Sequence, residues 1–286
     1  MNTKLQSFKE NAMRAVFLLC ACVSILAVIL ICFFLFANGI PTIGKIGVKE
    51  FLLGLDWKPL QNIFGILPMI IGSIYVTAGA VVIGVPIGLL CAVFLAKFCP
   101  EKLYKVFKPA VDLLARIPSI VYGFFGLVVI VPVMQNLFGG SGKGVLTASI
   151  MLGIMILPTI ISVSEAAIRA VPDSYYEGAL ALGATHERST FLAVLPAAKS
   201  GITAGVILGL GRAIGEAMAV NMVAGNQAII PKSLLSGVRT LTSNIVLEMG
   251  YATDLHREAL IATALVLFVF ILIINLLFSL AKKEKK

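Results

Sequence analysis

The sequence predicts an all-α membrane protein whose single domain, residues 1–286, crosses the bilayer with six helices. Of the 286 residues, 59% are hydrophobic and 13% are charged, whereas about a quarter of an ordinary soluble domain is charged. Six apolar stretches are each long enough to cross a hydrocarbon core, which takes about 20 helical residues. A soluble globular enzyme and a disordered chain are therefore excluded.

The predicted spans are continuously apolar rather than alternating, which favours helices over a β-barrel. We place them at about residues 15–40, 67–98, 110–136, 145–168, 198–228 and 258–281. The first span is too long for the apolar region of a signal peptide and lacks a cleavage site, so we expect a retained anchor. Pro86 is expected to bend the second span, and the apolar run of the fifth span is interrupted by Arg212 and Glu216.

The positive charge follows the predicted topology. The formal net charge is +9, from 23 Lys and Arg against 14 Asp and Glu. With the N-terminus inside, fifteen of these basic residues fall on the inner side, seven on the outer side, and Arg212 within a span. Because Lys and Arg accumulate in cytoplasmic loops, we expect a multi-pass protein of a bacterial cell membrane with both termini in the cytoplasm. Nucleic-acid binding is not expected.

No catalytic or cofactor-binding pattern is recognisable in the sequence. The glycine-rich stretch 139–144 lacks the order of a phosphate-binding loop and is interpreted as a flexible turn. His186 and His256 are expected to be solvated, and the five cysteines lack the spacing of a metal site, so no metal is predicted. The chain is therefore predicted not to be an enzyme and to hold no cofactor. Any ATP would be used by another polypeptide.

The inner loop at residues 169–199 carries a helical pattern. Ser174 and Glu177 have the spacing of a capping box, in which Ser174 would be the N-cap. Gly183 can end the helix that they begin. These residues predict a short helix at the membrane surface.

This loop resembles the EAA loop of ABC importer permeases, whose pattern is E-A-A, three residues, G, nine residues, I-x-L-P. The residues that match are Glu177, Ala179, Gly183, Leu195 and Pro196. Gly178 and Ala193 depart from the pattern but keep its small or apolar character. The resemblance implies that the loop is a coupling helix that docks on an ATP-hydrolysing subunit. Capping of a surface helix is the simpler interpretation of Glu177, and it is compatible with docking.

Arg212 and Glu216 stand four residues apart in the fifth span and would share one helix face. A charge at the membrane centre costs about 2.5–3.5 kcal/mol on insertion scales, and such residues usually face a bundle interior or a wet cavity. A guanidinium also suits a tetrahedral oxyanion, because it binds two oxygens at once. Two interpretations stay open: a self-neutralising pair that helps packing, or a place on a substrate pathway.

The sequence around this pair resembles the phosphate-specific transport (Pst) permeases, and in particular the PstC type. The stretch Gly211–Glu216, the stretch Arg116–Gly123, and the loop with Trp57 followed by Phe64–Gly72 carry the resemblance, which extends from about residue 15 to 280. It implies the type I ABC importer permease (MetI-like) fold and an ATP-driven importer of inorganic phosphate. It also implies a PstA-like second permease, a PstB-like ATPase dimer, a PstS-like extracytoplasmic binding protein, and transport roles for Arg212 and Glu216.

Other functions are compatible with parts of the sequence. A permease for sulfate or molybdate would meet the same tetrahedral chemistry. A secondary carrier driven by an ion gradient explains the spans and the intramembrane charges, but not the EAA spacing, and no broken-helix pattern repeats in two halves. A membrane scaffold needs no buried charge.

Overall fold

The structure is a computed structural model that describes residues 3–283, with the side chains of residues 10–277. Lys285 and Lys286, two basic residues counted for the inner side, lie outside the described residues. Within them, six helical stretches are long and apolar enough to cross a membrane: Glu10–Ile46, Leu67–Phe98, Ser119–Phe138, Val145–Arg169, His186–Gly215 and Asp254–Leu277. The predicted six-span, all-α fold class is therefore confirmed.

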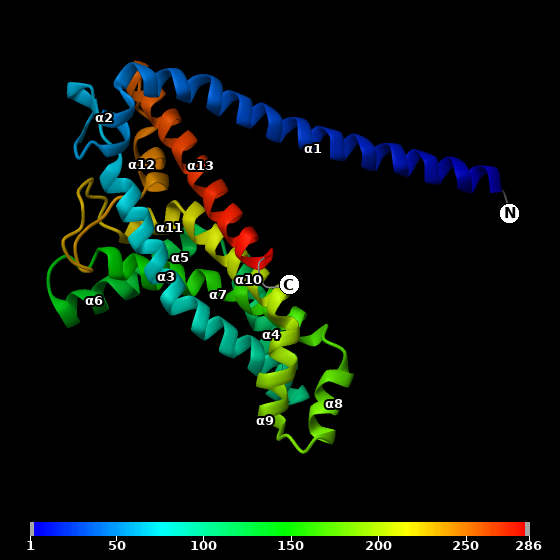
Figure 1. Ribbon diagram of the computed structural model, residues 1–286. Helices are drawn as coiled ribbons and strands as arrows, with labels where there is room; N and C mark the ends of the chain where they lie inside the picture. Colours follow the sequence, from blue (N-terminus) through cyan, green and yellow to red (C-terminus); the bar gives the residue numbers. More distant parts are fainter. Residues whose placement is uncertain (1–2, 284–286) are drawn as a thin grey trace.

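The long helices other than α1 lie together in a bundle (Figure 1). The first is α1 (Thr3–Ile46), which projects away from the others, and the last is α13 (Asp254–Lys283), which packs on the end of α1. Between them lie α3 (Leu67–Val93), continued by the π-helical η2 (Phe94–Phe98), and α7 (Val145–Arg169). α10 (Leu195–Gly215) follows the short helix α9 (His186–Ser189) and the π-helical η4 (Thr190–Val194).

The third span begins later than predicted. Residues 110–116 belong to a separate helix, α4 (Glu101–Arg116), and the chain leaves the helical conformation at Ile117, where φ is −65° and ψ is 127°. Pro118 is the cause, because the residue before a proline is disfavoured in the α region. The span then consists of α5 (Ser119–Phe125), η3 (Gly126–Ile130) and α6 (Val131–Phe138).

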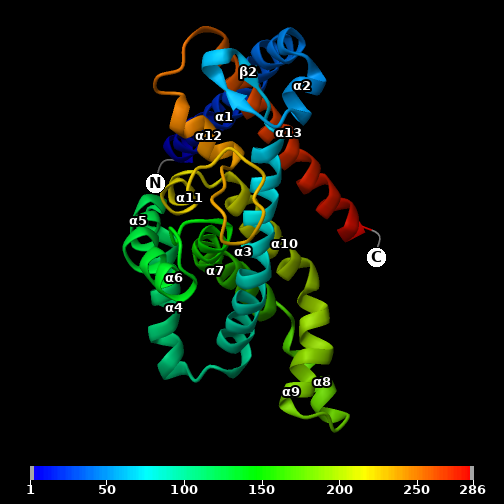
Figure 2. The same cartoon turned by 90° about the vertical axis from the view of Figure 1, so that its left-hand side faces the viewer.

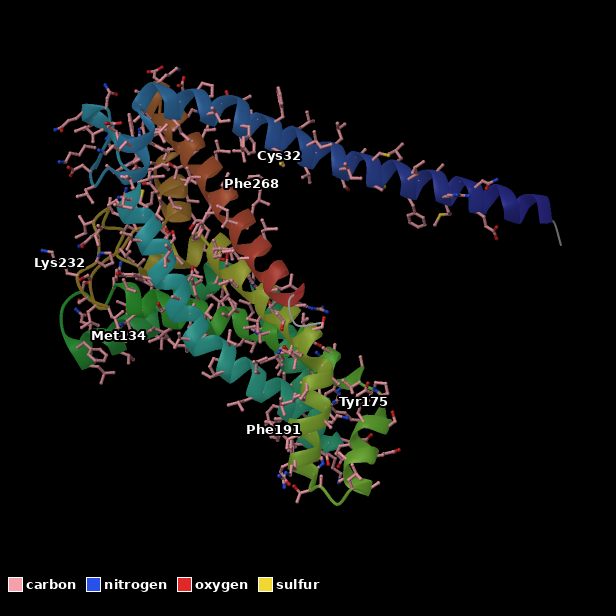
Figure 3. All side chains as sticks on the ribbon, viewed as in Figure 1. Cys32, Met134, Tyr175, Phe191, Lys232 and Phe268 are labelled. Atoms are coloured by element: carbon pink, nitrogen blue, oxygen red, sulfur yellow. The ribbon has the colours of Figure 1, made fainter. Side chains whose placement is uncertain are left out.

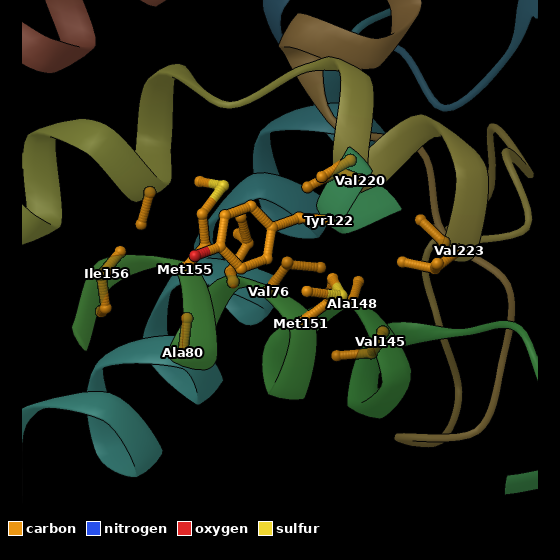
Figure 4. Close-up of a cluster of buried hydrophobic side chains, with 14 of the residues drawn as sticks. Val76, Ala80, Tyr122, Val145, Ala148, Met151, Met155, Ile156, Val220 and Val223 are labelled. Atoms are coloured by element: carbon orange, nitrogen blue, oxygen red, sulfur yellow. The ribbon is translucent and has the colours of Figure 1, made fainter. Parts of the chain in front are cut away.

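The core lies around α7, which packs against α3 and α10. Figure 4 shows Met151, Met155 and Ile156 of α7 gathered with residues of α3, α5 and α11 (Met218–Val223). Glycines allow the close approach: a Cβ at Gly209 of α10 would lie 2.8 Å from the Ile160 side chain. In lipid, where apolar burial does not drive helices together, such close packing is the main source of association.

The two ends of the bundle differ (Figure 2). At one, the hairpin end, lie α2 (Val48–Leu53), the strands β1 (Trp57–Lys58) and β2 (Ile63–Phe64) with the 3-10 turn η1 (Pro59–Gln61) between them, and α12 (Leu241–Glu248). At the other, the α8 end, lie α8 (Asp173–Ala181) and α9.

The hairpin end is held by buried Glu248, which accepts hydrogen bonds from Trp57 Nε1 at 2.8 Å and Arg239 Nη1 at 2.7 Å. His256 Nε2 lies 2.8 Å from the same carboxylate, so its expected solvation is wrong.

Candidate functional site

Arg212 lies three residues before the end of α10, half-buried beside α7. Its Nη1 donates a hydrogen bond of 3.2 Å to Thr159 Oγ1 of α7. A guanidinium has five N–H donors, and this is the hydrogen bond that its side chain makes to the described residues. The other donors are therefore available to a ligand. Thr159 was not predicted as a site residue, because in the sequence it is one hydroxyl group in an apolar span. The one feature that sets it apart in the sequence is that it directly follows Pro158.

Glu216 does not share a helix face with Arg212, and the predicted i,i+4 pair is wrong. α10 ends at Gly215, and Glu216 is extended, with φ −73° and ψ 127°. Its Oε1 instead accepts the Ala219 N–H of α11 at 3.0 Å, and its carbonyl accepts the Thr242 hydroxyl at 2.8 Å. A carboxylate at a helix N-terminus is favourable, so Glu216 fixes the turn that follows Arg212. In the described part of the chain, no ion pair joins the two residues.

The break after Gly215 also changes the predicted fifth span. Residues 198–228 were expected to form one helix, but α11 is separate and packs against α5. A Cβ at Gly123 of α5 would lie 2.8 Å from the Ala219 Cα. The Arg116–Gly123 stretch thus has a structural reason for its glycine, because α11 approaches α5 closely at this position.

The loop at residues 169–199 contains the predicted helix, α8, but the start of this helix differs from the prediction. Pro172 is the N-cap of α8, and no side-chain cap hydrogen bond is formed there. Ser174 lies inside the helix, so the predicted capping box is wrong. Glu177 is exposed on α8, and it is therefore free of the capping role that was the simpler interpretation.

Gly183 ends α8 as predicted. Its φ is +84°, a left-handed conformation that glycine adopts without steric cost. The Gly183 N–H bonds to the Leu180 carbonyl at 2.8 Å, and the Ala184 N–H bonds to the Ala179 carbonyl at 3.1 Å. These two bonds form a Schellman motif. Ala179 and Gly183 therefore contribute to one structural unit.

Leu195 and Pro196 mark the return of regular α-helix after η4. Pro196 has no N–H, and its ring conflicts with a carbonyl four residues earlier in an α-helix. A π segment directly before it widens the turn and accommodates the proline. Leu195 is half-buried and packs against the apolar cluster under α8.

α8 is held against the bundle by aromatic contacts. Tyr176 is hydrogen-bonded through its hydroxyl to His186 Nδ1 of α9, whose ring lies 4.6 Å from that of Phe98. The expectation that His186 is solvated is therefore wrong. Tyr175 and Phe191 remain exposed at this end, as Figure 3 shows. α8 is thus fixed through Tyr176, while Glu177 and Gly178 of the same helix are exposed.

Comparison with known proteins identifies the chain. The sequence profile of the family "Binding-protein-dependent transport system inner membrane component" matches residues 84–284. The chain belongs to this family. The matched region begins within α3 and includes the Arg212 site and α8.

Relatives of this permease cover most of its length. The probable ABC transporter permease protein YqgH of Bacillus subtilis is 40% identical over 94% of this chain and 91% of its own. The phosphate transport system permease protein PstC of Mesorhizobium japonicum is 38% identical over 84% and 80%. The probable PstC of Methanocaldococcus jannaschii is 31% identical over 96% and 92%. The resemblance to PstC-type permeases is confirmed.

Solved structures of ABC transporters share the fold of this permease. A chain of the inward-facing MetNI methionine ABC transporter matches with a TM-score of 0.63 and 20% identity, over 80% of this chain and 99% of its own. A chain of a bacterial transporter that imports alginate matches with a TM-score of 0.64 and 16% identity, over 98% and 99%. The MetI-like fold is thereby confirmed, and the permease is a multi-pass membrane protein.

Proposed function

We propose that this permease forms the membrane path of an ATP-driven importer of inorganic phosphate, together with a second, PstA-like permease. The observation that carries the proposal is the half-buried guanidinium of Arg212, which keeps unused donors at the end of a membrane helix. The similarity to PstC proteins supports phosphate as the anion.

A PstB-like ATPase dimer would bind at the α8 end, and a PstS-like protein would deliver phosphate at the hairpin end. This arrangement places the α8 end and both termini in the cytoplasm, which the excess of Lys and Arg on the predicted inner side supports. Closure of the ATPase dimer would move α8 and, through η4, the helix α10 that carries Arg212. Glu177, Ala179, Gly183, Leu195 and Pro196 would transmit this movement.

Arg212 would offer phosphate a transient positive contact, while Glu216 would hold the turn beside it and keep phosphate from being trapped. Weak binding matters because a conducting site must also release its ligand. The hydrogen bond from the Ala219 N–H to Glu216 Oε1 supports the first of these two roles, the holding of the turn.

The test is phosphate uptake by the whole complex reconstituted in vesicles. Arg212→Ala should reduce uptake by about tenfold or more, because a hydrogen bond to a charged group is worth about 1.5–3 kcal/mol. The matched control is Arg257→Ala, which removes an exposed arginine from the first turns of α13, at the hairpin end. Wild-type uptake by an assembled Arg212→Ala complex, or uptake without ATP on an ion gradient alone, would overturn the proposal. Competition by sulfate or molybdate would reassign the anion.

Coupling has a separate test. Gly183→Val forces a β-branched residue into the left-handed region and should disrupt the end of α8. Gly178→Ala, at a helical position with open space around it, is the control. We expect the valine variant to lose ATPase co-purification or to hydrolyse ATP without uptake. Normal association together with normal coupling would contradict a docking role for α8.

A further inference from the structure

A row of polar side chains leads from Arg212 toward the α8 end. Thr159 and Ser162 stand three residues apart on α7 and therefore lie on one face of the helix, about 4.5 Å apart along its axis. Thr159 bonds to Arg212, and Ser162 Oγ lies 3.3 Å from Lys108 Nζ of α4. Each of the two hydroxyl groups thus contacts a different cation.

α4 presents its polar face to α7. Its polar residues Tyr104, Lys108 and Asp112, spaced by four, are directed at α7 and bond to Glu165 or Ser162 there. Its large apolar residues Leu103 and Phe107 are both 45% exposed instead. In a membrane protein, polar side chains face the protein interior and the apolar side of an amphipathic helix can face lipid. This orientation places an ammonium group beside the hydroxyl row.

Lys108 is held by carboxylates and still reaches solvent. Its Nζ lies 3.2 Å from Asp112 and 3.0 Å from Glu165, and its side chain is 24% exposed. Glu165 also accepts from Tyr104 at 2.8 Å and Arg169 at 2.7 Å. Burial opposes the charge of Lys108, but hydrogen bonds to Glu165 and Asp112 outweigh it and raise its pKa. The ammonium is therefore charged at neutral pH, and nearby negative charge limits its hold on an anion.

We propose that Lys108 is a second, transient contact for the phosphate anion, reached from Arg212 past the hydroxyl groups of Thr159 and Ser162. The proposal rests on the proposed phosphate pathway. Asp112 competes with phosphate for the ammonium, so phosphate binds there weakly enough to leave. Glu165, which is 3% exposed, keeps the ammonium in position.

The competing interpretation is that this cluster only fastens α4 to α7. In that case removing either partner of the Lys108–Asp112 pair would have the same damaging effect. In an anion contact the two changes act in opposite directions, because Lys108 attracts phosphate and Asp112 repels it. Phosphate on the inner side of the membrane should also occupy the contact and slow transport.

The experiment measures phosphate uptake by the reconstituted complex, at saturating binding protein, with and without inorganic phosphate inside the vesicles. Lys108→Gln should lower turnover by about tenfold and abolish inhibition by internal phosphate. Asp112→Asn should be inhibited at about tenfold lower internal phosphate. Lys105→Gln, an exposed lysine on the same helix, should behave like the wild type. If Lys108→Gln fails to assemble, the inhibition measured for Asp112→Asn decides the proposal.

Equal loss of turnover in both variants, with a lower melting temperature and unchanged sensitivity to internal phosphate, would overturn the proposal in favour of fastening alone. Wild-type behaviour of both variants would also overturn it. Arg212→Ala tests the phosphate pathway separately from the second contact at Lys108. If Arg212→Ala abolishes uptake and Lys108→Gln does not lower it, the pathway stands and only the second contact is contradicted. If Arg212→Ala transports normally, the pathway itself fails.

Discussion

α1 and α7 are both long apolar helices, yet they contribute to the fold in opposite ways. The apolar 18-residue stretch of α1 has a higher mean hydropathy than that of α7. None of the α1 stretch is buried inside the protein, whereas 67% of the α7 stretch is buried. α1 meets the bundle near one end, where Gly39 packs on Leu265 and Phe36 on Phe268. α7 instead lies between α3 and α10.

Hydropathy therefore places a helix in the membrane but does not decide where the helix lies in the bundle. Lipid is as apolar as leucine, so close contact and polar groups must hold the helices together. α7 supplies both: Gly153 faces α3, Ser149 Oγ donates to the Val76 carbonyl at 3.2 Å, and Glu165 binds α4. α1 is bonded to the bundle mainly through residues at its last turns.

The largest effect should come from breaking the contact between α3 and α7. A Cβ at Gly84 would lie 2.9 Å from the Gly153 carbonyl oxygen, which is backbone and cannot move aside. Gly84→Leu should therefore destabilise the permease by about 3 kcal/mol. Gly44→Leu in α1, where nothing lies within 4 Å, should change little. Thermal unfolding in detergent measures both, and similar melting temperatures would contradict the central place of α7.

A smaller effect is expected from the buried carboxylate of α7. Glu165→Gln removes the charge that Lys108 and Arg169 share, at 3.0 Å and 2.7 Å. Because both cations are partly exposed and keep some hydration, the expected loss in unfolding free energy is about 2 kcal/mol. Denaturant unfolding of the purified permease tests this, and an unchanged transition would show that α4 is attached by other contacts.

The smallest effect should come from the carboxylate beside α1. Glu258 pairs with Lys45 at 2.9 Å, but the side chains are 42% and 60% exposed. An exposed pair contributes about 0.2–1 kcal/mol, so Glu258→Gln should leave the unfolding transition nearly unchanged. A loss as large as that of Glu165→Gln would mean that α1 is as firmly fastened as α7, and would remove the contrast between them.

The parts of the candidate site that could be predicted are those set by neighbouring residues. Gly183 ends α8 because only a few residues upstream and downstream decide a helix end. The predicted capping role of Ser174 was wrong because Pro172, two residues earlier, takes the N-cap position. The predicted Arg212–Glu216 pair was wrong because hydrogen bonds from Thr242 and Ala219 hold Glu216 in an extended turn.

Hydropathy and local backbone preferences act over one or two helical turns, so the residues alone predict the six spans, the α8 helix with its glycine end, and the place of Arg212 in the fifth long helical stretch. The tertiary structure alone decided that Arg212 meets Thr159, 53 residues away, and that Lys108 meets Ser162 and Glu165. Such partners are brought together by the packing of α4 and α10 on α7. The charge of each residue is visible in the chain, but its neighbour is chosen by the approach of another helix.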